Sequence, residues 1–192
     1  TIKGVFEWFT RDKRHLFLAT VGEGLDGFVI SFFWPVFVFT AVSSFEVLGG
    51  LTSAALLLSL LATFFASKVF DKKRALGGSE DEKVYWTASW LLALSRLARA
   101  VFGSLLGLFG VDLVGKLVSP YYWVPFGGYL YSAGKKDGGL RFYVAREIFY
   151  SLAIVLGSVL VWFLAPFAWR WWGIFGLSAM GVLLTMGLAK ES

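Results

Sequence analysis

Two carboxylates lie within a stretch of sequence that is otherwise suited to lipid. Glu23 and Asp26 belong to the segment G-E-G-L-D-G, and the apolar run over residues 16–41 has no other formal charge. An ionisable side chain at bilayer depth is costly, so a functional role is its default interpretation. A carboxylate in that position can bind a proton or a cation. Both residues are therefore candidates for ion or proton coupling in transport.

Two arginines, Arg96 and Arg99, lie in another apolar run, over residues 85–110. With a rise of ~1.5 Å per residue, Glu23 and Asp26 lie about 10 and 15 Å from the basic end of their helix. On the same scale Arg96 and Arg99 lie about 17 and 21 Å deep in a core of ~30 Å. Each pair is spaced by three residues and occupies one face of its helix. The arginines are possible partners of the carboxylates, either in an ion site whose pairing changes or in a static pair that fixes packing.

The glycines around the carboxylates match the string G-x-G-x-x-G of dinucleotide-binding proteins at Gly22, Gly24 and Gly27. That motif needs a preceding strand and a helix that begins at its glycines, whereas this match lies inside a long apolar run. The sequence instead predicts close packing against a neighbouring helix, or local unwinding beside the carboxylates. Gly103-x-x-x-Gly107 is interpreted as a packing motif of the third apolar run.

Enzyme chemistry finds little support in the sequence. Gly176-x-Ser178 raises the question of an intramembrane serine protease, which needs a base within reach of the serine. The one histidine, His15, lies at the far end of the chain near the water interface. Cysteine is absent, which excludes disulfides, thiolate catalysis and zinc-finger-type sites. We predict no enzyme activity, no metal and no cofactor.

The composition is that of a membrane protein. Hydrophobic residues make up 57% of the chain and charged residues 16%, whereas a soluble domain has about 25% charged residues. The net charge of +5 comes from short basic clusters between apolar runs and not from one basic face. A nucleic-acid partner is therefore not predicted, and the expected surroundings are a lipid bilayer.

The apolar runs predict an all-α membrane protein with six transmembrane helices in one bundle. The expected helices cover residues 16–41, 46–68, 85–110, 113–134, 140–165 and 168–188. Residues 1–15 are expected to form an amphipathic cytoplasmic lead-in, residues 16–188 the transmembrane domain, and residues 189–192 a cytoplasmic tail.

Breaks between and within these helices are predicted from prolines, glycines and polar residues. The polar stretch 67–83 is expected to be the longest loop, and the glycines over 110–115 a short turn. Pro35 is expected to kink the first helix, and Pro120 and Pro125 to bend or break the fourth.

Lysines and arginines lie mainly beside one set of helix ends, which indicates the cytoplasmic side. They occur in the N-terminal segment, in the loops between the second and third and the fourth and fifth helices, and at Lys190, whereas the opposite side has Lys116 and Arg170. Both termini are therefore predicted to lie in the cytoplasm, in a multi-pass protein of the cell membrane.

Aromatic side chains crowd the fourth apolar run. Their apolar bodies and polar tips suit a substrate path, although aromatics also fill the cores of helix bundles. The candidate cavity-lining residues are Tyr121, Tyr122, Trp123, Tyr129 and Tyr131.

The segment S-K-V-F-D-K-K-R-A-L, after the second apolar run, resembles the signature loop of the major facilitator superfamily, in which Gly-x-x-x-Asp is followed by basic residues. Asp71 takes the acidic position, and Ser67 stands where the family usually has glycine. The basic run and a charged pair at the start of the fifth helix are Lys72, Lys73, Arg74, Arg146 and Glu147. By this resemblance they and Asp71 would latch cytoplasmic helix ends together.

The resemblance implies one half of a transporter, because family members pair two six-helix halves, each built from two three-helix repeats. The first and fourth helices would line the cavity, whereas the usually peripheral third helix would remove Arg96 and Arg99 from the substrate path. The implied function is secondary active transport of a small solute, with or without protons, by alternating access. The chain would act as a homodimer or beside a second half of a longer chain. The alternative is a non-transporting bundle, which is a scaffold, a partner-binding subunit or an isolated half-domain.

Overall fold

The computed structural model describes residues 13–75, 80–102, 104–136, 139–167 and 170–190, and every regular element in those ranges is helical. The elements are α2 (Arg14–Phe28), η2 (Val29–Phe33), α3 (Trp34–Val42), α4 (Phe45–Ala75), α5 (Glu80–Ala98), α6 (Leu105–Lys136), α7 (Leu140–Leu164), α8 (Arg170–Leu184) and η3 (Thr185–Lys190). The predicted all-α fold is confirmed. Most of the predicted N-terminal lead-in, residues 1–12, and the last two residues of the tail lie outside the described ranges.

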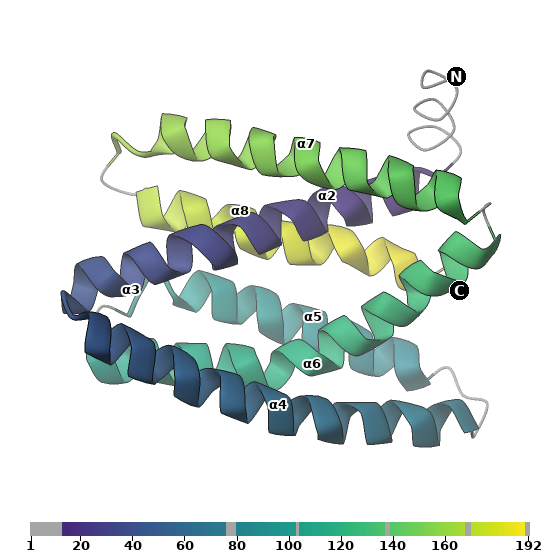
Figure 1. Ribbon diagram of the computed structural model, residues 1–192, viewed down its shortest axis with the longest axis horizontal. Coiled ribbons are helices and arrows are strands. Elements are labelled where there is room, and N and C mark those ends of the chain that lie inside the picture. Colours follow the sequence, from purple (N-terminus) through teal and green to yellow (C-terminus); the bar gives the residue numbers. More distant parts are fainter. Residues whose placement is uncertain (1–12, 76–79, 103, 137–138, 168–169, 191–192) are drawn as a thin grey trace.

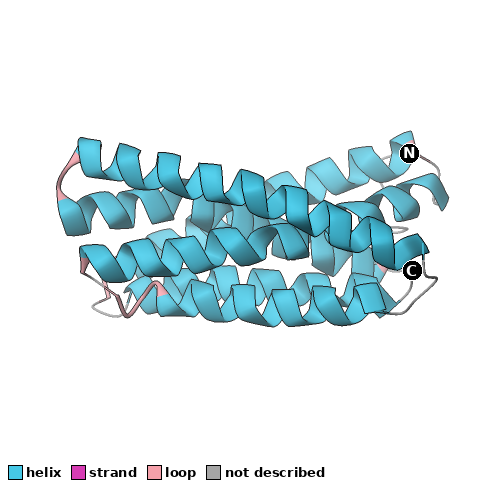
Figure 2. Cartoon of the chain, turned by 90° about the horizontal axis from the view of Figure 1, so that it is seen from below, coloured by secondary structure: helices cyan, strands magenta, loops and turns pink. Residues whose placement is uncertain are grey.

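The helices lie side by side in one bundle, and successive helical segments run in opposite directions (Figures 1 and 2). The start of α2 and the end of η3 consequently lie at the same end of the bundle. Four helical stretches of the described chain are long and apolar enough to cross a membrane: Arg14–Ala41, Phe45–Asp71, Leu140–Leu164 and Arg170–Leu188. Together with the composition they indicate a membrane-embedded protein.

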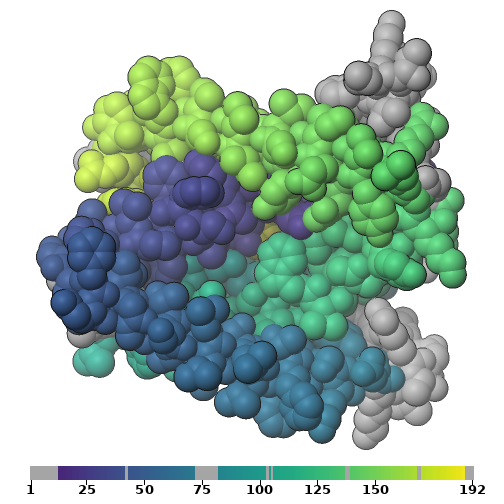
Figure 3. Space-filling view, in the orientation of Figure 1, coloured from purple at the N-terminus to yellow at the C-terminus, as the bar shows by residue number. Residues whose placement is uncertain are grey.

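Lipid contact explains the apolar outer faces of α4 and α7. On α4 the exposed side chains include Leu56, Leu60 and Phe64, and on α7 Val155 and Trp162. A helix that is apolar on all sides is stable where lipid takes the place of water. The space-filling view shows α4 in blue and α7 in green on either side of α2 and α3 (Figure 3).

The first helical segment is irregular just before Pro35. There the Trp34 N–H donates to the Val29 carbonyl, five residues earlier, which defines the π-helical turn η2. Proline has no N–H to donate and its ring crowds the preceding turn, so the helix widens to accommodate it. The predicted irregularity at Pro35 is therefore a π-helical turn, and the chain continues as α3.

The predicted third helix and the turn after it are wrong. The structure ends α5 at Ala98, and α6 begins at Leu105, so the predicted turn over 110–115 lies inside α6. Ser104 supplies the reason, because its hydroxyl accepts the Gly107 N–H at 3.2 Å and so caps the new helix. Gly107 thus belongs to α6 and not to a packing motif of the third helix, and Gly103 lies outside the described residues.

Two other boundaries differ from the prediction. The expected loop 67–83 is shorter, because α4 continues to Ala75 and α5 already begins at Glu80. In α6, Pro120 and Pro125 lie inside one helix. That helix bends and does not break, since its two halves run in different directions (Figure 1).

Two apolar clusters fill the bundle at different heights. One includes Leu16 and Ala19 of α2, and the other begins at Phe28. Asp26 lies between them along the same helix. Polar side chains near Asp26 are therefore enclosed by apolar layers on both sides.

Candidate functional site

Asp26 is the centre of a buried polar network that joins three helices. Arg96 of α5 donates from Nε to Asp26 Oδ1 at 3.0 Å and from one Nη to Oδ2 at 3.2 Å. The Ser178 hydroxyl of α8 also donates to Oδ1. Asp26 is 1% exposed and Arg96 4%. The two residues that the sequence placed at one depth therefore form a two-point ion pair inside the bundle.

Glycines bring the helices close enough for this network. A Cβ atom on Gly22 of α2 would overlap the carbonyl oxygen of Gly181 on α8, and one on Gly24 would overlap Ala153 of α7. Asp26 lies one turn beyond Gly22, and Ser178 lies one turn before Gly181, so the same contact sets the two side chains face to face. Because α2 stays regular through Phe28, the glycines serve close packing and not local unwinding.

Arg99 does not join the carboxylates of α2 as the sequence suggested. It follows the last residue of α5, and its Nη2 donates to Asp112 Oδ1 of α6 at 2.9 Å. Its guanidinium carbon lies 4.0 Å from the centre of the Trp34 ring. This ion pair links α6 to the turn that follows α5. The Arg99 guanidinium at the same time packs on the Trp34 ring of the first helical segment.

Glu23 pairs with Arg146 of α7, at 2.5 and 2.7 Å from one guanidinium nitrogen to the two carboxylate oxygens. The sequence placed Arg146 in the cytoplasmic latch, but its side chain reaches Glu23 instead. Its neighbour Glu147 is exposed. One turn along α2 therefore separates two ion pairs, and each ties the helix to a different neighbour.

A cavity of about 210 Å³ opens beside Asp26. Its walls come from α2 and η2, from α5 and from α6. The lining residues are Asp26, Gly27, Ile30, Ser31, Arg96, Gly115, Lys116, Ser119 and Trp123. The volume is far larger than one water molecule needs, so this is a space for a solute or several waters inside an apolar bundle.

Lys116 is the basic residue of this cavity that sequence reasoning misplaced. Because α6 begins at Leu105, Lys116 lies well inside that helix and not, as predicted, near its start on the opposite side. It is half-buried, and it makes no hydrogen bond or ion pair with any residue that the structure describes. Asp112, one turn earlier on α6, is already paired with Arg99.

The predicted aromatic lining is divided among four places. Trp123 lines the cavity beside Asp26, and Tyr131 is exposed. Tyr121 lines a larger apolar groove of about 480 Å³ on the outer face of α5 and α6. Tyr122 and Tyr129 pack on Tyr85 in the bundle core, with ring centres 5.6 and 5.4 Å away.

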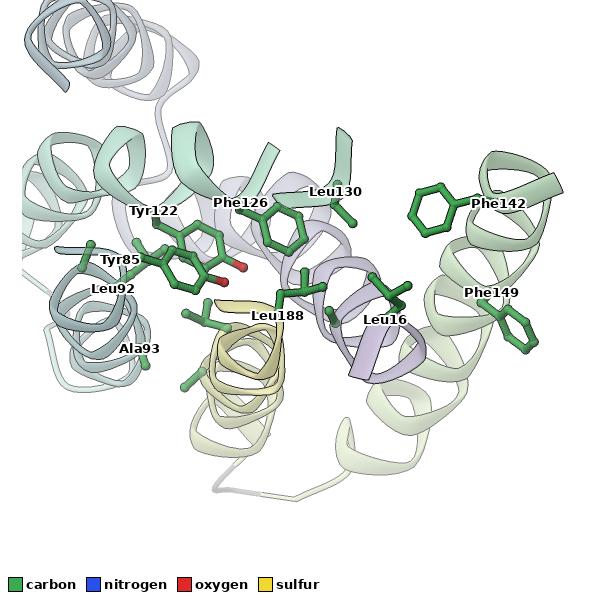
Figure 4. Close-up of a cluster of buried hydrophobic side chains, with 14 of the residues drawn as sticks. Leu16, Tyr85, Leu92, Ala93, Tyr122, Phe126, Leu130, Phe142, Phe149 and Leu188 are labelled. Carbon is green, nitrogen blue, oxygen red and sulfur yellow. The ribbon is translucent and has the colours of Figure 1, made fainter. Parts of the chain in front are cut away.

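The tyrosine hydroxyls of the core meet on Thr185. Tyr122 donates to its hydroxyl at 2.9 Å, and Tyr85 lies 3.0 Å from both its hydroxyl and its carbonyl oxygen. In Figure 4 the two rings lie face to face with their hydroxyl groups adjacent. Tyr122 is a core residue that joins α6 to η3, and it is not among the residues that line the cavity beside Asp26.

The remaining latch residues lie at the basic end of the bundle. Asp71 is exposed near the end of α4. The side chains of Lys72, Lys73 and Arg74 lie outside the described part of the structure. Contact between Asp71 and a second half is a prediction.

Asp112 and Thr185 were not identified from the sequence, and Ser178 was considered only as a protease nucleophile and not as a partner of Asp26. Asp112 is the only acidic residue between Glu82 and Asp137, and that isolation in an apolar segment was the signal that could have found it. Ser178 and Thr185 gave no such signal, because hydroxyls in membrane helices can bond their own backbone.

Within the described residues, no group of three or more His, Asp or Glu side chains is placed to hold a metal ion. The chain matches no protein-family model, no curated protein and no solved structure. These comparisons give no support to the resemblance to the major facilitator superfamily, which rests on the loop around Asp71, the pair Arg146 and Glu147, and the expected six-helix topology.

Proposed function

We propose that this chain is one six-helix half of a secondary active transporter, which moves a small solute by alternating access together with a second half. The observation that carries the proposal is the polar cavity beside Asp26, Arg96 and Lys116 in a membrane-embedded bundle. A space lined by ionisable groups is expensive to keep in lipid, and such groups mark substrate or ion pathways.

The proposed topology has six membrane-spanning helices, including the more polar α5 and α6, with both termini in the cytoplasm of a cell-membrane protein. The described basic residues support this orientation. Lys13, Arg14, Lys68, Lys135 and Lys136 belong to the end of the bundle where the chain starts, and such enrichment marks the cytoplasmic side. The two three-helix repeats are part of this proposal.

In the proposed mechanism Asp26 is the coupling residue. Its ionised form accepts three hydrogen bonds, from Arg96 and Ser178. A proton or cation at the carboxylate would weaken its attraction to Arg96 and free the guanidinium, so that occupancy of the site changes the contact between α2 and α5. Glu23 is the second candidate, through its pair with Arg146.

The test is solute uptake by the full chain, purified from its native membrane with any associated partner and reconstituted into proteoliposomes. A mixture of small metabolites is offered under an imposed proton gradient, and the vesicle contents are identified by mass spectrometry. We expect one solute to accumulate, its accumulation to collapse with a protonophore, and Asp26→Asn to reduce it at least about tenfold. Glu46→Gln, which removes an exposed carboxylate that does not line the cavity, should leave uptake unchanged.

The second candidate function is a non-transporting bundle in which the charges only fix helix packing. The burial and two-point geometry of the Asp26–Arg96 pair favour it, because such a pair also suits a static link. Cross-linking in native membranes separates the candidates. A chain that is strictly monomeric cannot enclose a cavity between two halves, and that result would contradict the transporter proposal.

A further inference from the structure

Among the described residues, the charges of three ion pairs and of the cavity beside Asp26 do not balance. Three carboxylates, Glu23, Asp26 and Asp112, face four bases, which are Arg96, Arg99, Lys116 and Arg146. Each carboxylate is in an ion pair with one arginine. The remaining positive charge is therefore that of Lys116.

This unbalanced charge belongs to a residue that lines the cavity. Lys116 lines it together with Arg96, whose guanidinium is held by Asp26 on one side. The neighbouring acid that Lys116 could approach on its own helix, Asp112, is held by Arg99 at 2.9 Å. An ammonium group in a low-dielectric space attracts an anion strongly, since few waters are present to screen it.

The rest of the lining favours an organic anion of small size. Ser31 and Ser119 offer hydroxyl donors, whereas Ile30 and Trp123 offer apolar surface. One excess positive charge is neutralised by one negative charge. We propose that the cavity binds a small monovalent carboxylate, with its carboxylate at Lys116 and its apolar part toward Ile30 and Trp123.

The inference rests on the proposed function, because it names the solute class of the same cavity, but its test does not require transport. The full chain is purified in lipid nanodiscs and its thermal unfolding is measured in rising concentrations of sodium acetate. Sodium gluconate, whose hydroxylated chain lacks an apolar part to lie against Ile30 and Trp123, keeps the ionic strength constant. Acetamide is the matched probe, because it has the shape of acetate without its charge.

We expect acetate to raise the unfolding temperature with saturation, as a ligand of the folded state does, and acetamide to have no effect. Lys116→Met should weaken the apparent affinity for acetate at least about tenfold, whereas Lys116→Arg should keep it. Lys83→Met is the matched control, since Lys83 lines the separate outer groove of α5 and α6. It should bind acetate as the unchanged protein does.

Intrinsic fluorescence gives a second readout that does not depend on the Lys116 variants folding. Acetate should change the tryptophan emission of the unchanged protein, and Trp123→Phe should abolish that change, because Trp123 is the tryptophan that lines the cavity. Equal responses to acetate and acetamide, or an acetate response unaltered in a folded Lys116→Met protein, would overturn the anion site.

The two proposals fail separately. Uptake of a cationic or neutral solute would refute the anion site and keep the transporter. Saturable acetate binding by a chain that transports nothing would keep the anion site and refute the transporter.

Discussion

Removing one partner of the Asp26–Arg96 pair should destabilise the bundle more than removing both. Arg96→Met leaves the Asp26 carboxylate with Ser178 as its remaining described donor, in a place where Asp26 is 1% exposed. Asp26→Asn leaves the Arg96 guanidinium buried beside a neutral group. Each single change creates a buried charge without a counter-charge.

The size of the effect follows from burial and geometry. Breaking a buried pair from one side costs about 3–5 kcal/mol, whereas replacing the whole pair by neutral groups is close to neutral. Both donor distances in this pair, 3.0 and 3.2 Å, are those of formed hydrogen bonds. In the double variant the asparagine oxygen still accepts the Ser178 hydroxyl. We therefore expect a coupling energy of about 3 kcal/mol between the two changes.

The assay is reversible unfolding in mixed micelles of dodecyl maltoside and SDS, followed by far-ultraviolet circular dichroism. The single variants, the double variant and the unchanged protein form one thermodynamic cycle. Lys136→Met, at an exposed position in the last turn of α6, controls for the loss of a positive charge. Additive single effects, or an Arg96→Met protein as stable as the Lys136→Met protein, would refute the reasoning.

Three further predictions use the same unfolding assay. Gly181→Ala should cost about 1–3 kcal/mol, because its new methyl group would meet the backbone of α2, whereas Gly176→Ala on the same helix meets nothing within 4 Å and should be harmless. Tyr122→Phe should cost about 1 kcal/mol through the loss of its buried hydrogen bond, and the exposed Tyr131→Phe should change nothing; equal effects would contradict the described core. Ser104→Ala should cost about 0.5–2 kcal/mol, because α6 loses its cap; no loss would place the start of that helix elsewhere.

Much of the fold could be predicted because membrane helices are long, apolar and separated by polar residues. Asp26 and Arg96 could be predicted to lie at one depth because both belong to helices that run along one axis at a known rise. The break after α5 could not be found in the same way. Glycines at 110 and 115 resemble a turn, but glycine is tolerated within membrane helices, and the actual signal was the single capping hydroxyl of Ser104.

The partners of Arg99 and Glu23 could not be predicted, because depth along the axis does not say which helices are neighbours. That α2 packs between α7 and α8 depends on glycine contacts that involve residues far apart in sequence. Because the break was misplaced, Lys116 was predicted to lie near a helix end on the opposite side and not beside a cavity. Depth along the helix axis thus predicts the Asp26–Arg96 ion pair but not the cavity beside it.

The long sequence separation of the ion pairs has a consequence for synthesis of the protein. Asp26 precedes Arg96 by 70 residues in the sequence, and Glu23 precedes Arg146 by 123 residues. At the ribosome α2 therefore emerges long before its counter-charges exist, and an unpaired aspartate at the middle of a helix opposes release into lipid by about 2.5–3.5 kcal/mol. We therefore expect the first helix to remain beside the insertion machinery until α5 and α7 have been synthesised. Helix assembly and membrane insertion are then coupled in this chain.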